Sequence, residues 1–152
     1  MDEVMKILVS DDVSEKGVEL LRQNGYTVDV ETNLDEDQLA ERIGKYDGLI
    51  TRSMTHVTAK VIEKAKKLKI VGRAGVGIDS IDLKAATARG IIVVNAPTSN
   101  TIAATEHTCA MILAVTRHIP QAHDSLMSGE WNREKFTGIQ LKDKTMGIIG
   151  VG

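Results

Sequence analysis

The stretch KIVGRAGVGIDSIDLKAATARGIIVVNAP, residues 69–97, decides the fold. Its pattern is typical of an apolar strand (69–74), a glycine-containing turn, a helix (80–90) that ends at Gly90, and a second apolar strand (91–95). Two strands joined through a helix run parallel, because the crossover returns the chain to the same end of the sheet. The segment therefore predicts a βαβ unit.

The same alternation runs from the N-terminus up to this unit. Strands are expected over residues 6–10, 26–30 and 48–51, and helices over residues 14–25, 35–45 and 58–68. In the first helix, Ser14 is the expected cap, Gly25 the stop, and Val18, Leu21 and Leu20 the apolar face. Apolar strands without alternation are typical of a sheet buried on both faces. We therefore expect an α/β fold with a flavodoxin-like, parallel, five-stranded sheet over residues 1–97.

The pattern changes after Pro97. Residues 99–119 predict a single long helix, so apolar from 103 to 115 that it should pack on more than one side. Pro120 should end or kink that helix, and a more polar helix and loop should follow over 121–136. Residues 144–150 predict a new strand. We expect residues 98–152 to hold crossover helices and the first strand of a second, truncated domain.

Composition limits the function. The 152 residues are 42% hydrophobic, with 19 basic and 21 acidic side chains and 3% aromatic residues, a balance that disfavours a nucleic-acid partner. No signal peptide and no apolar run of membrane-spanning length is present, so we expect a cytoplasmic protein without a membrane partner. The single cysteine, Cys109, excludes a disulfide framework, and its apolar surroundings predict a buried structural residue.

Ligands of open parallel sheets bind beyond the carboxyl ends of the strands. Asp11 and Asp12 follow the first strand, as in phospho-receiver domains, but the third strand ends in Thr51 and Arg52 instead of the acceptor aspartate. We therefore interpret the two acids as loop and helix-start residues. The pair Arg52–Ser53 can hold a phosphate or carboxylate, although a surface arginine paired with an acid is the alternative.

A glycine turn, Gly75-Val76-Gly77, follows the fourth strand. Ser80 occupies the third glycine position and the next strand ends in Asn95 instead of an acid, so the turn is not a site for adenosine phosphates. Its N–H groups could form a nest for a small anion, or the glycines could serve conformation alone. Asp79 and Asp82 should cap and charge the next helix.

Other polar residues support weaker interpretations. Ser99, Asn100 and Thr101 could cap the long helix, or one of them could face a ligand. His107 is expected to be a core or interface residue. The spacing of His118 and His123 across Pro120 is poor for a metal, and no metal site is expected.

The chain ends on KTMGIIGVG, residues 144–152, in which Gly150 and Gly152 fit the first two glycines of a dinucleotide-binding turn. The third glycine of that turn would fall at position 155.

Taken together, the motifs RS, GRAGVGID, VVNAP, NTIAATEHT, IPQAH and GEW resemble the D-3-phosphoglycerate dehydrogenases of the D-2-hydroxyacid dehydrogenase superfamily over essentially the whole chain. The resemblance implies a discontinuous substrate-binding domain (1–97), a Rossmann NAD domain inserted after the long helix, and a symmetric homodimer through residues 99–138. It implies NAD as cofactor, a small phosphorylated 2-hydroxy acid as ligand, and oxidation of 3-phospho-D-glycerate to 3-phosphohydroxypyruvate, the first step toward serine.

The resemblance also assigns roles to individual residues. It places the catalytic residues downstream of residue 152, which would leave this fragment inactive, and Val76 on the nicotinamide side of NAD. Trp131 corresponds to a residue at the subunit interface, and Gly150 and Gly152 to the pyrophosphate turn. The implied substrate-binding residues are Arg52, Ser53, Gly75, Val76, Gly77 and Asn100. A glyoxylate or hydroxypyruvate reductase, or a non-catalytic substrate-binding or dimerisation module, remains the alternative.

Overall fold

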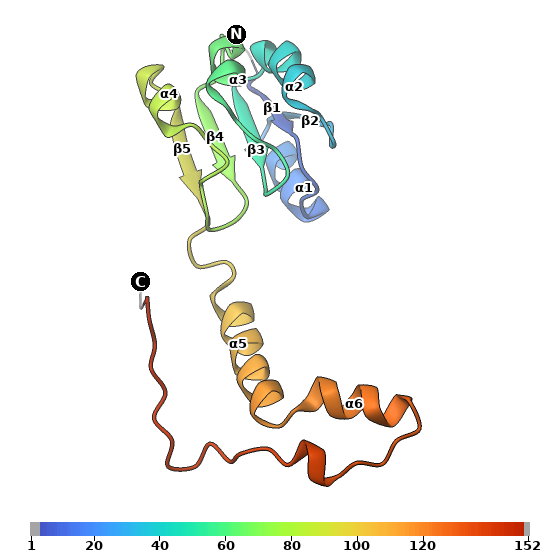
Figure 1. Cartoon of the computed structure of the whole chain (residues 1–152). Coiled ribbons are helices and arrows are strands. Elements are labelled where there is room, and N and C mark those ends of the chain that lie inside the picture. Colours follow the sequence, from blue (N-terminus) through green and yellow to red (C-terminus); the bar gives the residue numbers. More distant parts are fainter. Residues whose placement is uncertain (1–3, 151–152) are drawn as a thin grey trace. The chain divides into compact units, whose positions relative to one another are not determined.

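A computed structural model describes residues 4–150 and divides the chain into two units, Met1–Asn100 and Thr101–Gly152. The first unit contains a five-stranded sheet in the order β2-β1-β3-β4-β5, with every pair parallel (Figure 1). The strands are β1 (Lys6–Val9), β2 (Thr27–Val30), β3 (Gly48–Thr51), β4 (Ile70–Arg73) and β5 (Ile92–Asn95). The expected α/β fold class is confirmed.

The strand order fixes where the site can lie. From β1 the chain first moves outward to β2 and then crosses back to β3, so the order reverses between β1 and β3. Loops that leave β1 and β3 diverge at their carboxyl ends and open a crevice there. The residues that follow these two strands therefore occupy the topological switch point.

Four helices connect the strands of the first unit: α1 (Glu15–Gln23), α2 (Glu36–Arg42), α3 (Ala59–Lys64) and α4 (Leu83–Ala88), with a short 3₁₀ turn, η1 (Ile43–Lys45), after α2. All four are shorter than expected. Their N-termini follow the sequence signals, because Asp82 and Thr58 cap α4 and α3, and Asp35 forms a capping box with Gln38 at α2. Ser14 precedes α1 without a side-chain cap bond.

Glycines Gly25 and Gly90 follow α1 and α4 with φ angles of 87° and 68°. Glycine reaches this left-handed region without steric cost, so both expected helix stops are confirmed.

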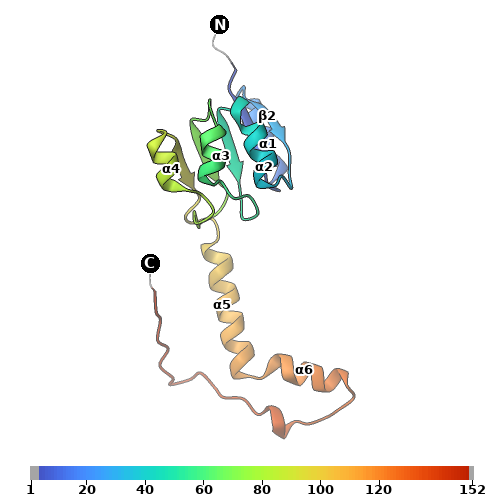
Figure 2. The same ribbon diagram turned by 45° about the horizontal axis from the view of Figure 1, so that its top comes forward.

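The main core lies between the sheet and the helices α2, α3 and α4, which cover one face of it (Figure 2). Tyr46 is fully buried in this core, and its hydroxyl donates to Asp29 Oδ2 at 2.8 Å. Burial and that bond raise the pKa of Tyr46 well above its usual value. The tyrosine therefore joins η1 to strand β2.

A smaller core lies on the opposite face, where α1 packs Val18 against Val9 and Val28. Val93 packs toward the main core, so its neighbours in β5 face the α1 side, where Ile92 is 60% and Val94 45% exposed. Helices thus cover both faces of the sheet at β1 and β2, as expected. At β5 the expectation is wrong, because the face on the α1 side is exposed.

The second unit contains α5 (Thr101–Thr116), α6 (Ile119–Met127) and the 3₁₀ turn η2 (Glu134–Phe136). The long helix expected over 99–119 is confirmed as α5 but is shorter, because it ends before the proline, near His118, whose φ of 52° is left-handed. Pro120 lies in the first turn of α6, where its missing N–H leaves no bond unmade. The helix expected from 121 therefore starts earlier and ends at Met127.

The strand expected over residues 144–150 is not formed. A strand is defined by a partner strand, and the described part of the second unit offers this apolar stretch none.

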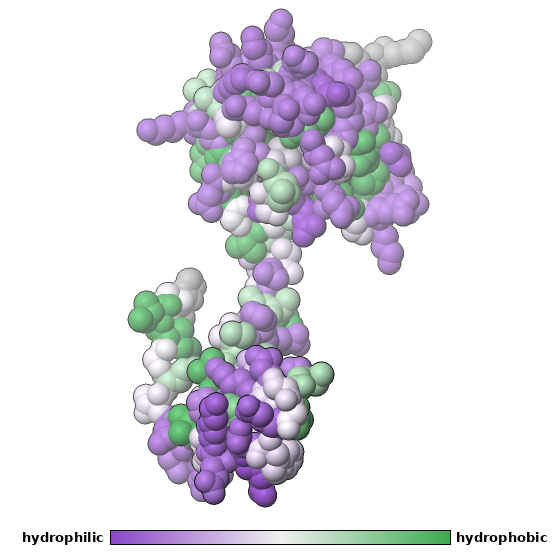
Figure 3. Space-filling view, turned by 45° about the vertical axis from the view of Figure 1, so that its right-hand side comes forward, coloured by the Kyte–Doolittle hydropathy of each residue, from purple (hydrophilic) through white to green (hydrophobic). Residues whose placement is uncertain are grey.

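Apolar side chains of the second unit remain exposed (Figure 3). No residue of α5 is buried, although the helix is apolar around its circumference. Cys109 and His107 are exposed as well. The prediction of a buried cysteine is therefore wrong in this structure, and of the two roles expected for His107, core or interface, the core role is contradicted. The reason is that an apolar helix is buried only where another element covers it.

Residues 4–150 contain neither a candidate membrane span nor a candidate metal cluster. None of their helices combines the length and the apolar character that crossing a bilayer requires. No group of three or more histidine, cysteine, aspartate or glutamate side chains is arranged to hold a metal ion in this part of the chain.

Candidate functional site

The candidate site starts with the loop that follows β3 at the switch point. Asp11, just beyond β1, is 5% exposed and accepts several hydrogen bonds from residues 51–55. Its Oδ2 accepts from the Arg52 amide, from Thr51 Oγ1 at 3.1 Å and from the Thr55 amide at 3.2 Å. Its Oδ1 accepts from Thr55 Oγ1 at 2.9 Å. One carboxylate thus ties the end of β1 to the whole loop.

These bonds also set the ionisation of Asp11. Burial alone would raise its pKa, but the donors from Arg52, Thr55 and Thr51 outweigh burial and hold the pKa below its usual value. Asp11 is therefore a structural acid, as the sequence indicated, and it stays ionised near neutral pH.

Arg52 lies on the surface of this loop. Its Nη1 donates to the backbone oxygen of Asp12 at 3.0 Å, and its guanidinium forms no ion pair with any acid in residues 4–150. Among residues 4–150, the alternative of a surface arginine paired with an acid therefore finds no support. A guanidinium without an acidic partner remains available for an anionic ligand.

A second arginine, Arg73, ends β4 and was missed by sequence reasoning. It is half-buried, and its Nε is buried without a hydrogen-bond partner. The guanidinium packs against Gly75, where an added Cβ would lie 2.6 Å from Nη1. Because Thr51 and Arg73 are paired across β3 and β4, this arginine lies one strand away from the Arg52 loop. A signal existed in the sequence: a cation as the last residue of a buried parallel strand.

The turn after β4 is held from the neighbouring strand. Asn95 Nδ2 donates to the Val76 oxygen at 2.7 Å, and the Ala96 amide donates to the Gly75 oxygen at 2.9 Å. The Gly75 amide is used internally, donating to Arg73 O at 2.8 Å, whereas the amides of Val76 and Gly77 have no partner among the described residues. Two N–H groups of the expected nest are therefore available.

The glycines of this turn do not serve unusual dihedral angles, because neither Gly75 nor Gly77 has a positive φ. Close approach to the Arg73 side chain accounts for Gly75 instead. A conformational role alone is therefore the wrong interpretation for that position.

A pocket of about 250 Å³ lies at this edge, lined by Ser53, His56, Arg73, Gly77, Asp79 and Ser80. It brings two predicted residues, Ser53 and Gly77, together with Arg73, His56 and Ser80, which the sequence did not single out. The Ser80 hydroxyl is buried without a partner, like Arg73 Nε. Buried polar atoms are costly when unpaired, so both are suited to a ligand that supplies acceptors.

The remaining predicted residues, including Arg52 and Gly75, do not line this pocket. Asn100 is exposed, and Val76 is 46% exposed on the outside of its turn. Trp131 and Gly150 belong to the second unit, and Gly152 lies outside the described residues.

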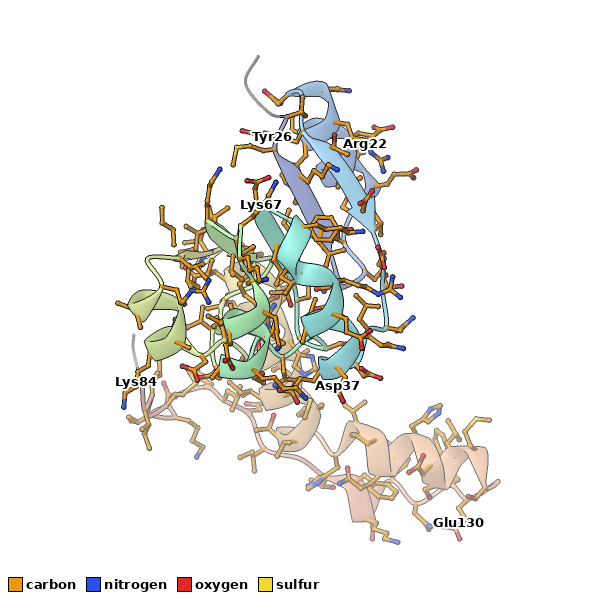
Figure 4. The ribbon with its side chains drawn as sticks, turned by 90° about the horizontal axis from the view of Figure 1, so that it is seen from above. Arg22, Tyr26, Asp37, Lys67, Lys84 and Glu130 are labelled. Carbon is orange, nitrogen blue, oxygen red and sulfur yellow. The ribbon has the colours of Figure 1, made fainter. Side chains whose placement is uncertain are left out.

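A larger hollow of about 870 Å³ lies between α2 and α3, with lysines Lys45, Lys60, Lys64 and Lys66 on its walls. Lys60 is already paired with Asp37, which marks the start of α2 in Figure 4. Because acidic side chains, Asp37 and Glu41, lie among these lysines, we interpret the hollow as a solvated surface. It serves as the comparison site in the binding experiments below.

Fold and site together define a class of protein: an open parallel α/β domain whose carboxyl edge offers guanidinium, hydroxyl and backbone N–H donors to a small anion. A family profile, "D-isomer specific 2-hydroxyacid dehydrogenase, catalytic domain", matches residues 7–142. The chain belongs to this family.

Individual proteins with similar sequences or structures support this assignment. The chain is 51% identical to the D-3-phosphoglycerate dehydrogenase of Archaeoglobus fulgidus over 148 residues, covering 97% of this chain and 28% of the relative. A solved NAD⁺-bound 3-phosphoglycerate dehydrogenase of Entamoeba histolytica is 31% identical, with a TM-score of 0.69 over 76% of this chain and 40% of that one. An acyclic imino acid reductase in complex with NADPH and D-Arg is 27% identical, with a TM-score of 0.85 over 97% of this chain and 49% of that one. The chain thus spans less than a third of its curated relative.

Proposed function

We propose that this chain is the substrate-binding part of an NAD-dependent dehydrogenase that oxidises 3-phospho-D-glycerate to 3-phosphohydroxypyruvate. The observation that carries the proposal is Arg73, whose half-buried guanidinium has no ion-pair partner in residues 4–150 and whose Nε is buried and unpaired. A buried or partly buried cation without a counter-ion is unfavourable unless a ligand neutralises it.

The donors match a ligand with two anionic groups. Arg73 and Ser80 line the pocket, and each carries a buried polar atom without a partner. Ser53 lines the pocket from the neighbouring loop, and Arg52 precedes it in that loop. Arginine binds phosphate and carboxylate with two parallel bonds, and backbone N–H groups such as those of Val76 and Gly77 hold carboxylates well. A phosphorylated 2-hydroxy acid carries one group of each kind, whereas lactate or glyoxylate carries a carboxylate alone.

The homology to D-3-phosphoglycerate dehydrogenases supports the same substrate. NAD, which the Entamoeba relative binds, supplies the hydride acceptor in this proposal, with Gly150 and Gly152 in the pyrophosphate turn. In this proposal the residues of the first unit would bind and orient the acid, and Val76 would lie on the nicotinamide side of NAD. Acid–base chemistry is assigned to residues beyond position 152.

A homodimer through residues 99–138 is part of the proposal. Its support is the exposed apolar side chains of α5, α6 and the segment after them, including Val115 at 65%, Met127 at 74% and Trp131 at 73% exposure. Contiguous exposed apolar surface on this scale marks interaction sites. An exposed free thiol at Cys109 fits a reducing compartment, and we place the protein in the cytoplasm.

Calorimetric titration of the 152-residue chain tests the substrate. We expect 3-phospho-D-glycerate to bind more tightly than D-glycerate or inorganic phosphate, because each of these supplies one of the two anionic groups. Arg73→Met should weaken phosphoglycerate binding about tenfold or more, the loss typical of a charge-assisted hydrogen bond.

The matched control is Lys66→Met, which removes a cation from the α2–α3 hollow and should leave the affinity unchanged. Equal affinity for phosphoglycerate and D-glycerate would contradict the phosphate assignment. Equal losses in the two variants would indicate attraction by overall charge instead of a site.

A further inference from the structure

Asp11 makes no contact with the pocket, yet it holds the loop from which the proposed ligand residues project. Thr51 and Thr55, the ends of that loop, are 0% and 4% exposed, while Arg52, Ser53 and Met54 between them are exposed. The bonds from Thr51, the Arg52 amide and Thr55 all converge on the Asp11 carboxylate. The Arg52 side chain itself makes one hydrogen bond to the described residues, from Nη1 to the Asp12 oxygen.

We propose that Asp11 is a positioning residue, which fixes the 51–55 loop so that Arg52 and Ser53 remain presented at the carboxyl edge of the sheet. The effect on affinity rests on the proposed function, whereas the effect on the loop does not. A negative charge close to an anion site opposes binding, so an acid at this position needs another reason. Its geometry supplies that reason, because one carboxylate accepts all four donors.

The proposal requires that the side chain at position 11 accept hydrogen bonds, and it does not require that this side chain be charged. In Asp11→Asn the amide oxygen can accept from the Arg52 and Thr55 amides, while Thr51 Oγ1 can donate to the Thr55 oxygen, 3.5 Å away. The new NH₂ group can donate to Thr55 Oγ1, whose own hydrogen can turn to Ser10 O, now 3.4 Å away. Asparagine therefore satisfies the loop without a charge, whereas alanine leaves buried donors unpaired.

Hydrogen exchange of the 152-residue chain measures the loop directly. In Asp11→Ala we expect the Arg52 and Thr55 amides to exchange at least about tenfold faster, while the Glu31 amide, bonded to Val9 O at 2.9 Å, keeps its protection as a fold control. In Asp11→Asn both loop amides should stay protected.

The affinity for 3-phospho-D-glycerate should follow the loop. We expect about a tenfold loss in Asp11→Ala and rescue by Asp11→Asn to within about twofold. Unchanged loop exchange in Asp11→Ala, or an equal affinity loss in both variants with the Glu31 amide protected, would overturn the proposal. If alanine unfolds the chain, Thr55→Val removes one donor and should give an intermediate exchange rate, and an unaltered rate would count against the proposal. Absence of binding by the unmutated chain would refute the proposed substrate, while the exchange data would still decide the role of Asp11.

Discussion

At the scale of single residues, the site depends on contacts between side chains and backbone that come from different strands. Arg73 keeps its position because Gly75 leaves room beside it, and Asn95 holds the turn from β5. Arg52 keeps its position because its amide is bonded to Asp11. Both arginines proposed to bind ligand are therefore placed by a neighbouring residue, Gly75 or Asp11.

Gly75→Ala tests the first of these contacts. Its Cβ would lie 2.6 Å from Arg73 Nη1, so the guanidinium must move, and we expect weaker phosphoglycerate binding measured by calorimetry. Gly17→Ala is the control, because nothing lies within 4 Å of that Cβ and alanine stabilises a helix interior by about 0.5–1 kcal/mol. Unaltered affinity in Gly75→Ala would argue against a role for Arg73.

The ionisation of Asp11 predicts a pH dependence of stability. Its folded-state pKa lies below the unfolded value near 3.8, so the ionised carboxylate stabilises the fold above that value. This contribution is lost as pH falls from about 4 through the folded-state pKa. Urea unfolding of the chain between pH 2 and 7 should therefore show a fall at the acid end that is smaller in Asp11→Asn. Identical pH profiles would contradict the cited hydrogen bonds.

At the scale of elements, the strands were predictable because uninterrupted apolar runs and the stops at Gly25 and Gly90 are local signals. Helix lengths were overestimated because the ends of α3 and α4 depend on distant partners. Arg89, after α4, donates to the Ile62, Glu63 and Ala65 oxygens at 3.0–3.3 Å and so closes the C-terminus of α3. Sequence periodicity carries no information about such a contact.

Removal of this contact gives an element-scale prediction. Arg89→Met should lower the free energy of unfolding by about 1–2 kcal/mol, since it leaves carbonyl groups at the end of α3 without a charged donor. Chemical denaturation measures the change. Lys84→Met, at an outward-pointing residue of α4 in Figure 4, is the control and should stay within about 0.5 kcal/mol.

At the scale of the whole molecule, the predictions that proved wrong were those that depend on tertiary contacts. The strand over 144–150 and the burial of Cys109 both needed a covering element, which local pattern cannot supply. The site was partly predictable, since Arg52, Ser53 and Gly77 follow strand ends that parallel topology brings to one edge. Arg73 also ends a strand, but the buried, unpaired Nε that distinguishes it from a surface arginine is visible only in the structure.

Self-association is the prediction at this scale. We expect the chain to form dimers through residues 99–138, because dimerisation would cover apolar side chains such as Trp131, 73% exposed. Sedimentation equilibrium should show a mass that rises above 16.5 kDa with concentration, and Trp131→Ala should weaken the association. A monomer at high micromolar concentration would rule the dimer out.

The central claim is that the carboxyl edge of the sheet binds a small phosphorylated acid, and amide chemical-shift mapping tests it most directly. The ¹⁵N-labelled 152-residue chain is titrated with 3-phospho-D-glycerate, and each backbone amide is followed. We expect saturable shifts confined to residues 51–56 and 73–80, with weaker changes for D-glycerate. Shifts concentrated at Lys45, Lys60 and Lys64 in the α2–α3 hollow, or no saturable shift at the edge, would contradict it.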